Sequence, residues 1–181
     1  MFITTEPTPN PATLKFLPGC EVLAAGTADF SNPNAARKSP LARHLFEIDE
    51  VSGVFLGPDF ISVTCATGDW LHVKPLVLGA IMEHFTSGQP VIDEDLMTLA
   101  TDSGEDDAVV AQIKDLLETR VRPAVTQDGG DIVFQRYESG IVYLHMQGAC
   151  SGCPSSTATL KYGIENLLRH YIPEIVEVRP V

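Results

Sequence analysis

The chain has 181 residues, of which 44% are hydrophobic, and its formal net charge is −12 from 12 basic and 24 acidic side chains. This length allows one large domain or two small ones, and no run approaches the roughly 18 apolar residues that would span a bilayer. The acidic balance argues against a nucleic-acid groove, which needs Lys and Arg to displace counterions, so we expect no nucleic acid and no membrane partner.

Residues 1–92 predict a small α+β module. Apolar, β-branched and aromatic runs predict four short strands, at residues 2–5, 13–17, 51–56 and 60–65, and the last two form a hairpin. A helix is expected to begin with Ser39 as its N-cap and Pro40 in the first helical position. Helical spacing predicts a second helix over 74–85. The order is β-β-α-β-β-α, and nothing in this module has the spacing of a catalytic or metal site.

The isolated cysteines and histidines of this module are interpreted as structural. Cys65 falls in step with Ile61 and Val63 on the face that we expect to be buried. A free cysteine behaves there as a small hydrophobe, and Cys20 receives the same interpretation. Trp70 is expected in a turn, with its ring packed on the core. Three histidines have no ligand pattern and are expected to be solvated or hydrogen-bonded: His44, His72 and His84.

Residues 93–107 are the best candidate for a domain boundary. They contain seven acidic side chains and no basic one, which is more than half of the net charge. Because like charges repel, such a segment stays extended, and we interpret it as a solvated linker, with an acidic docking surface as the alternative. Residues 96–99 in its middle are apolar enough to form a short helix against one domain.

Residues 108–181 predict a second module in the order α-β-β-α-β. An amphipathic helix begins near Val109 and is expected to end at Arg122 and Pro123. Asp-Gly-Gly-Asp at 128–131 predicts a tight turn. Two strands, a helix and a final strand follow, at residues 132–137, 141–146, 155–171 and 174–178. The fold class is therefore α+β, with two small mixed domains, 1–92 and 108–181. The second core is small enough that a cofactor or a dimer partner would help to stabilise it.

Two cysteines stand three positions apart in residues 148–154, Gly-Ala-Cys-Ser-Gly-Cys-Pro, between a strand and a helix. Thiolates are soft ligands that suit iron–sulfur clusters, zinc or copper(I). Pro154 suits the first helical position, which makes Cys153 the N-cap and turns its sulfur toward unpaired N–H groups that lower a thiol pKa. Gly148 and Gly152 carry no Cβ, so backbone amides can approach sulfide and donate hydrogen bonds to it.

The pair Cys150 and Cys153 leaves several uses open. Four cysteines are too few for a secreted disulfide scaffold, so in a reducing compartment the pair binds a metal or cluster, or cycles between dithiol and disulfide. Thioredoxin-like proteins place the motif early in a βαβ framework, whereas a hairpin precedes it here. Two unoccupied surface thiols are the remaining interpretation.

Two cysteines do not complete a metal site. A cluster usually takes four thiolates and structural zinc takes four ligands, and the chain has no second Cys-x-x-Cys pair. The economical solution is a symmetric dimer in which each chain offers Cys150 and Cys153 to one shared centre. A cluster held in this way in a surface loop could leave by ligand exchange with an incoming protein, as in a carrier. Strand alternation gives no reason to aim His145 at the loop.

At these residues the chain resembles the Nfu family, whose C-terminal domain is shared with NifU. The C-terminal resemblance is carried by four segments, 128–131, 148–156, 159–161 and 172–178. The N-terminal module resembles the Nfu N-terminal domain in three segments, 8–19, 39–42 and 59–63. The resemblance covers nearly the whole chain except the acidic linker.

The resemblance implies an iron–sulfur scaffold or carrier, not an enzyme, that binds a labile [4Fe–4S] cluster between two chains and passes it to apo-proteins. A [2Fe–2S] cluster is the alternative cargo. Carried over to this sequence, the ligands are Cys150 and Cys153. The implied partners are a second copy, apo iron–sulfur clients engaged through the N-terminal module, and upstream cluster-assembly proteins. A dithiol–disulfide oxidoreductase and a zinc-bridged interaction module remain as alternative functions.

The N-terminus lacks the basic start and apolar core of a signal peptide, and it is not an Arg-rich transit sequence. We therefore expect a cytoplasmic bacterial protein, or an organellar protein whose presequence has been removed.

Overall fold

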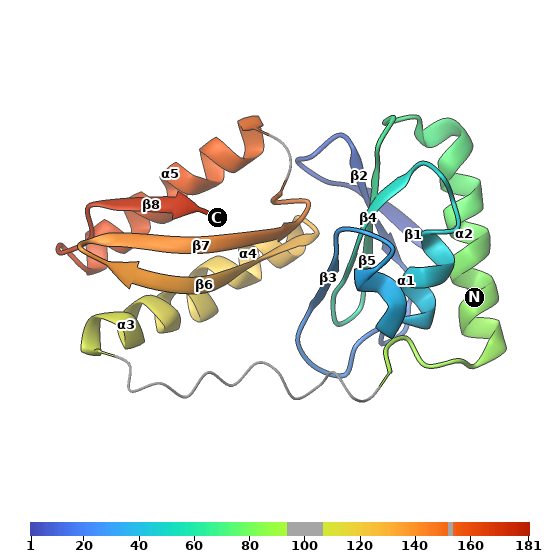
Figure 1. Cartoon of the computed structure of the whole chain (residues 1–181), viewed down its shortest axis with the longest axis horizontal. Coiled ribbons are helices and arrows are strands. Elements are labelled where there is room, and N and C mark those ends of the chain that lie inside the picture. Colours follow the sequence, from blue (N-terminus) through green and yellow to red (C-terminus); the bar gives the residue numbers. More distant parts are fainter. Residues whose placement is uncertain (94–106, 152–153) are drawn as a thin grey trace. The chain divides into compact units, whose positions relative to one another are not determined.

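The computed structural model describes residues 1–93, 107–151 and 154–181. The chain divides into two compact units, Met1–Thr101 (unit 1) and Asp102–Val181 (unit 2), each with its own sheet and helices (Figure 1). The expected α+β class is confirmed. The short helix expected at 96–99, and all but the ends of the acidic segment, lie outside the described residues. None of the described helices is both long and apolar enough to cross a membrane.

Unit 1 is built on a five-stranded antiparallel sheet in the order β1-β2-β5-β4-β3. Its strands are β1 (Thr4–Pro7), β2 (Thr13–Leu17), β3 (Ala28–Phe30), β4 (Val51–Leu56) and β5 (Ile61–Cys65). Its helices are the 3-10 turn η1 (Ala35–Lys38), α1 (Pro40–Leu45) and α2 (Trp70–Ser87). The β4–β5 hairpin and α1 agree with the sequence prediction, whereas β3 and η1 were not predicted.

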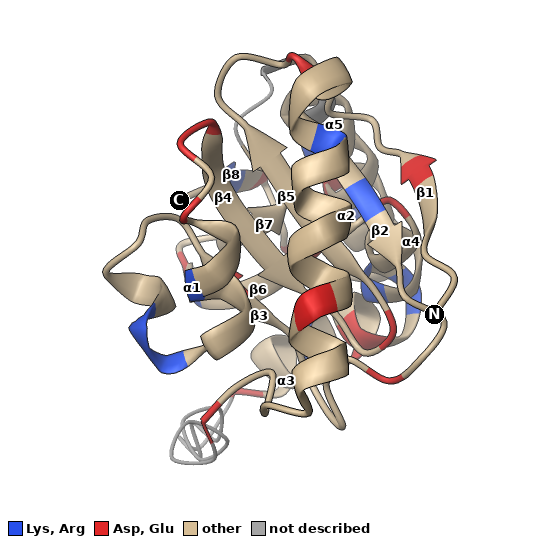
Figure 2. Ribbon diagram, turned by 90° about the vertical axis from the view of Figure 1, so that its right-hand side faces the viewer, with Lys and Arg blue, Asp and Glu red and all other residues tan. Residues whose placement is uncertain are grey.

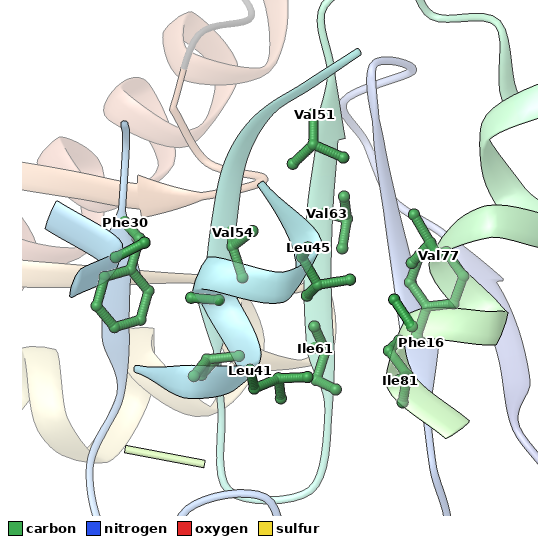
Figure 3. Packing of buried hydrophobic residues seen from close by; sticks show 14 of the residues in the cluster. Phe16, Phe30, Leu41, Leu45, Val51, Val54, Ile61, Val63, Val77 and Ile81 are labelled. Carbon is green, nitrogen blue, oxygen red and sulfur yellow. The ribbon is translucent and has the colours of Figure 1, made fainter. Parts of the chain in front are cut away.

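The helices α1 and α2 place their apolar side chains over one face of this sheet (Figure 3). Leucines of α1 and aliphatic residues of α2 contact strand residues that all point to the same side. Residues of this core that are at most 1% exposed include Phe16, Leu41, Leu45, Val54, Leu56, Ile61, Val63, Val77 and Ile81. Cys65 belongs to this core, as predicted, with no exposed surface.

Ser39 caps α1 as predicted. Its hydroxyl accepts a hydrogen bond from the Ala42 N–H (3.1 Å) and donates one to the Val91 carbonyl (2.5 Å), and Pro40 follows it in the first helical turn. A cap of this type stabilises a helix by about 1 kcal/mol. The same hydroxyl also ties the segment that follows α2 to the start of α1.

The start of α2 differs from the prediction. The helix begins at Trp70 rather than at residue 74, because the carboxylate of Asp69 accepts the Leu71 N–H (3.2 Å) and so supplies an N-cap. Pro75 lies inside the helix, where its missing N–H leaves the Leu71 carbonyl without a helical partner, but Leu71 is 82% exposed and water can take that place. Trp70 is therefore helical rather than in a turn, and its ring lies 6.1 Å from that of Phe16.

Two further predictions for unit 1 are wrong. The first strand begins at Thr4 rather than at residue 2, and it runs through Pro7, which an edge strand tolerates because one side needs no N–H donor. Cys20 is exposed rather than buried, because it follows a turn at Gly19 (φ 76°) that leaves the sheet.

The histidines of unit 1 differ from one another. His72 lies 3.0 Å from Asp69 and His44 lies 3.8 Å from Glu83, so both pair with surface carboxylates. His84 is only 3% exposed, and its Nε2 has no hydrogen-bond partner among the described residues, contrary to the prediction. Burial, followed by the neighbouring His44, lowers the pKa of His84.

Unit 2 is built on a three-stranded sheet in the order β6-β7-β8, with β6 antiparallel and β8 parallel to β7 (Figure 1). Its strands are β6 (Gly130–Glu138), β7 (Ile141–Gly148) and β8 (Glu177–Pro180). Its helices are α3 (Ala108–Leu116), the π-helical turn η3 (Leu117–Val121), α4 (Arg122–Gln127) and α5 (Pro154–Tyr171). The continuous stretch from α3 to α4 and the helix α5 pack on the sheet face that carries Val142, Leu144 and Met146, alternate residues of β7.

Pro123 does not end the first helix of unit 2, so that prediction is wrong. The helix continues to Gln127, because the chain widens into the π-helical turn η3 just before the proline. In this turn the Arg122 N–H bonds to the Leu117 carbonyl, five residues back. The wider register makes room for a residue that lacks an N–H and would clash with the carbonyl four positions earlier.

The last strand lies later in the chain than predicted. Residues 172–175 form a turn closed by a bond from the Ile175 N–H to the Ile172 carbonyl, and the Val176 N–H then bonds to the Gly140 carbonyl. β8 then pairs with β7 from Glu177 onward, at the sheet edge, where Pro180 is tolerated.

Candidate functional site

Two glycine turns meet at one end of the β6–β7 hairpin. Gly129 (φ 80°) lies immediately before β6 and Gly148 (φ 62°) ends β7, and both take backbone conformations that favour glycine. The strand register pairs Gly130 with Gly148, and the Ala149 N–H donates to the Gly129 carbonyl (3.2 Å). The Asp-Gly-Gly-Asp turn and the cysteine loop, which the sequence analysis treated separately, are therefore one structural site.

Cys150 is held at the centre of this site and is only 6% exposed. Its N–H donates to the Gln147 carbonyl (3.3 Å), and its carbonyl accepts from the Thr157 hydroxyl on α5 (3.1 Å). Its sulfur rests against Gly130, where a Cβ atom would lie 2.5 Å from Sγ. The absence of a side chain at Gly130 thus creates the space that the Cys150 sulfur occupies.

The surroundings of Cys150 disfavour its charged form. Burial, and then the negative charges of Asp128 and Asp131, raise the pKa of Cys150 to about 12. In the chain without metal the sulfur is therefore a thiol near neutral pH. A metal ion that binds to this sulfur must displace its proton. Catalytic thiols of disulfide oxidoreductases show the opposite shift, with a lowered pKa in an electropositive setting.

A buried ion pair supports the turn beneath Cys150. Asp131 has no exposed surface, and its two oxygens accept hydrogen bonds from the Arg122 Nε (2.9 Å) and Nη2 (2.8 Å). Asp131 also accepts the Ile132 N–H (2.8 Å), and Arg122 donates a further bond to Glu118 (2.6 Å). These bonds raise the pKa of Arg122. The pair joins the first residue of α4 to the start of β6, and so fixes where the Gly129–Gly130 turn lies.

The second predicted ligand, Cys153, lies outside the described residues, together with Gly152. Its expected role as N-cap stays a prediction, although α5 does begin at Pro154, as predicted. Cys20 and Cys65 belong to unit 1. His145 does not face the loop, because its Nδ1 lies 2.9 Å from the carbonyl of Val181.

The chemistry of the site fits a thiolate ligand but not a complete metal centre. Among the described residues, no group of three or more His, Cys, Asp and Glu side chains could hold a metal ion. Cys150 is soft and shielded from water, in a cradle that a Cβ at residue 130 would fill. The described part of one chain therefore offers only Cys150 at this position, and a metal centre there would need ligands from elsewhere.

Sequence reasoning missed three residues that position this site: Gly130 as the surface under the sulfur, Arg122 as the partner of Asp131, and Thr157 as the donor to the loop. The Asp-Gly-Gly-Asp string was a usable signal, since two adjacent glycines often mark a close approach of backbone. Arg122 and Thr157 carry no sequence signal, because nothing in the residues between each of them and its partner, nine and seven positions away, indicates the hydrogen bond.

Two protein-family models match the chain. "Scaffold protein Nfu/NifU N terminal" matches residues 3–88, and "NifU-like domain" matches residues 113–179. The second match contains Arg122, Asp131, Cys150 and Cys153, so the whole candidate site lies within it.

Similar proteins align over the whole chain. The chain is 52% identical over 183 residues to "NFU1 iron-sulfur cluster scaffold homolog, mitochondrial" of Homo sapiens, and 53% identical over 184 residues to the protein of the same name in Drosophila virilis. It spans 72% and 62% of the length of these two relatives. A solution structure of a NifU-like protein from Saccharomyces cerevisiae is 26% identical, with a TM-score of 0.47, over 52% of this chain and 86% of that one.

Proposed function

The chain belongs to the Nfu family, and from this premise we propose that it is an iron–sulfur cluster scaffold and carrier. In this proposal two chains hold a labile [4Fe–4S] cluster through Cys150 and Cys153 of each, and pass it to apo-proteins. The cluster is cargo rather than a resident cofactor. The relatives are named iron–sulfur cluster scaffolds, and the motif of the C-terminal unit supplies the ligands.

The observation that carries the proposal is the placement of Cys150. Its sulfur sits over Gly130 between two paired glycine turns, immediately before the helix α5. Backbone at such turns can come close to a bulky cluster because glycine has no Cβ. A thiol with a pKa of about 12 loses its proton readily only when a metal takes the proton's place. The site therefore favours metal ligation over free thiolate chemistry.

A second copy is required to complete the ligand set. Four thiolates usually hold a cluster, and the loop supplies two per chain. No further group of metal-binding side chains gathers in the part of the chain that the structure describes. A two-fold symmetric dimer brings together two identical loops, and hence four cysteines, without any other change.

The same observation counts against the oxidoreductase alternative. A catalytic dithiol needs an attacking thiolate, and burial of Cys150 suppresses that form. We therefore propose a binding protein without catalytic turnover. A zinc-bridged dimer would use the same four thiolates, so metal analysis separates it from the carrier.

Unit 1 is proposed to engage apo client proteins, and upstream assembly proteins are proposed as the source of the cluster. Its long helix α2 has only two Lys, Arg, Asp or Glu side chains, Lys74 and Glu83, and is otherwise uncharged (Figure 2). Three large apolar side chains of α2 are exposed: Leu71 by 82%, Leu76 by 54% and Met82 by 45%. We propose that client proteins contact these exposed side chains.

For the compartment, we propose a reducing one. A bacterial cytoplasm and an organelle both qualify, and the relatives that are named mitochondrial favour the second.

The test is anaerobic reconstitution of the full chain, followed by measurement of iron, acid-labile sulfide, zinc and solution mass. We expect about four irons and four sulfides per dimer in the wild type. Cys150→Ser should lose them, because a serine oxygen is a poor substitute for a soft sulfur ligand. Cys20→Ser is the matched control: the same change at an exposed cysteine of unit 1 should leave the cluster content unchanged.

The outcomes separate the candidate functions. Two irons and two sulfides per dimer would change the cargo to [2Fe–2S] and keep the carrier. Zinc without sulfide would support the interaction module. A metal-free monomer with a reversible Cys150–Cys153 disulfide would overturn the carrier and favour the oxidoreductase. Transfer to an apo iron–sulfur enzyme, measured by its recovered activity, tests the second half of the proposal.

A further inference from the structure

The sheet of unit 2 has two different faces. Its helices pack on the face that carries Val142 and Leu144, so the alternate residues of β7, Ile141 and Tyr143, point to the other side and are partly exposed. None of the described helices of unit 2 packs apolar side chains on this second face, which we call the open face. There β7 lies between β6 and β8 (Figure 1).

A row of two arginines and a tyrosine crosses the open face. Arg136 of β6 and Arg179 of β8 are both strand-register partners of Tyr143 in β7. The guanidinium of Arg136 lies over the Tyr143 ring, 4.3 Å from its centroid, and the two arginine side chains are 63% and 50% exposed. These three residues form the basic row.

A second row, two residues along the strands, is acidic. Glu138 of β6 and Glu177 of β8 are the register partners of Ile141, and these three residues form the acidic row. A β-bulge just before Arg136 aligns the rows. Without its extra residue Arg136 would pair with Val142 on the helical face, so the bulge turns the charged end of β6 to the open face.

The two rows are complementary to a second copy of themselves. Each row carries two charges of one sign, and a two-fold axis that runs across the strands between the rows places the basic row of one chain over the acidic row of the other. Each arginine then faces the partner's glutamate of the same strand, and Tyr143 faces Ile141 of the partner subunit. We propose that the open face of unit 2 is a surface through which two chains associate. This contact is separate from the shared cluster of the proposed function and does not rest on it.

The dimensions of a sheet allow this packing. Residues two apart on a strand are separated by about 6.7 Å, and neighbouring strands by about 4.8 Å. Aligned sheets cross at about 30°, which shifts each outer strand by about 2.8 Å, less than half the spacing of the rows. Each arginine also lies near the glutamate of its own strand, at 3.9 Å on β6 and 3.2 Å on β8, and its several N–H donors leave room for a second carboxylate.

The contact is small and distant from Cys150. A patch of three short strands covers about 300 Å² per chain, well below the roughly 800 Å² per partner of a standard interface, so we expect weak and reversible association. Cys150 follows the other end of β7. The two-fold arrangement therefore holds the two Cys150 residues apart, and a chain that uses its open face can share a cluster only with a different copy.

Sedimentation equilibrium of the full metal-free chain, from micromolar to millimolar concentration, tests the inference. Excess EDTA and a reducing agent prevent metal or a disulfide of exposed Cys20 from joining two chains. Wild type and Cys150→Ser should form the same dimer. Arg136→Glu and Glu138→Arg should each weaken it about tenfold, because two like-charge contacts replace two attractive ones. Arg37→Glu, the matched change at an exposed arginine of unit 1, should leave it unchanged.

An equal mixture of the two weakened variants separates the proposed contact from a loss of fold. The Arg136→Glu chain carries two glutamates on β6 and the Glu138→Arg chain carries two arginines, so every facing pair on this strand is again opposite in sign. Association in the mixture should return to that of the wild type. A general charge effect predicts otherwise, because Glu138→Arg makes the acidic chain less negative and would by itself strengthen association.

A wild type that stays monomeric over the whole range overturns the inference. So does a mixture that associates no better than the single variants, or a dimer that none of these substitutions weakens. All of these results are obtained without metal and leave the carrier function standing. The carrier function fails separately, if the reconstituted wild type takes up no cluster.

Discussion

Gly130→Ala tests the contact on which the site depends. A Cβ at this position would lie 2.5 Å from the Cys150 Sγ, 2.7 Å from the Gln147 carbonyl oxygen and 2.9 Å from the Cys150 nitrogen. Ordinary carbon contacts are about 3.5–4.0 Å. The sulfur can rotate away from a methyl group, but the two backbone atoms belong to the hydrogen-bonded turn at 147–150 and cannot move independently.

The expected cost follows from these distances. Overpacking of a buried site costs about 1–3 kcal/mol, and a broken turn hydrogen bond costs roughly 1 kcal/mol more. The alanine also lowers the entropy of the unfolded chain, which returns about 0.4–1 kcal/mol. We therefore expect unit 2 to lose about 1–3 kcal/mol of unfolding free energy. The iron content after reconstitution should fall with it, because the sulfur is displaced.

Gly163→Ala is the matched control. Gly163 lies on the exposed side of α5, and no atom lies within 4 Å of the added Cβ, so the same change should stabilise unit 2 by about 0.5–1 kcal/mol. Urea unfolding followed by circular dichroism measures both variants. Fluorescence of Trp70, the only tryptophan of the chain, should report an unchanged unit 1 in each. If Gly130→Ala is as stable as the wild type and retains its cluster, Cys150 does not rest on Gly130.

Three further predictions follow from buried charge. Arg122→Met should cost unit 2 about 2–4 kcal/mol in urea unfolding, because it takes the guanidinium away from the buried carboxylate of Asp131. A loss below about 1 kcal/mol would contradict this role of the ion pair. The lowered pKa of His84 means that this side chain binds a proton less readily in the folded unit 1 than in the unfolded chain, so the unfolding free energy should fall as the pH drops below 6.5. His84→Asn should flatten this pH dependence, and an unchanged slope of unfolding free energy against pH would contradict this reasoning. Alkylation of Cys150 in the metal-free chain, followed by peptide mass spectrometry, should be far slower than that of exposed Cys20 at pH 8 and should rise about tenfold per pH unit up to pH 10; a plateau near pH 8 would contradict the raised pKa.

Several elements were predictable because their causes are local. The Ser39–Pro40 start of α1 depends on one hydroxyl and one fixed φ, and the helix α5 on the spacing of its own apolar residues. The faces of β7 follow from alternation within the strand. The cysteine motif was also visible in the sequence, since two thiols three positions apart depend on chain order alone.

Errors occurred where a neighbour changes the outcome of a local rule. Pro123 is a strong helix-ending signal, yet the π-helical turn before it supplies the room that the ring needs. The start of α2 was predicted too late, because the cap at Asp69 starts the helix before Pro75 and the freed carbonyl of Leu71 is exposed to water. Helix propensity gives the free-energy cost of placing a residue in a helix. The surrounding structure decides whether other interactions offset that cost.

The sequence by itself therefore determined the family, the α+β class and the identity of the proposed ligands, because these depend on residue types and their spacing. Only the tertiary structure decided how Cys150 is held. The register of β6 and β7 places Gly130 under its sulfur, and Arg122 of α4 donates hydrogen bonds to Asp131 of β6. These contacts join β6 to the loop after β7 and to α4, which are separate elements of unit 2. The charge and burial that act on the sulfur are properties of that arrangement and of no single motif.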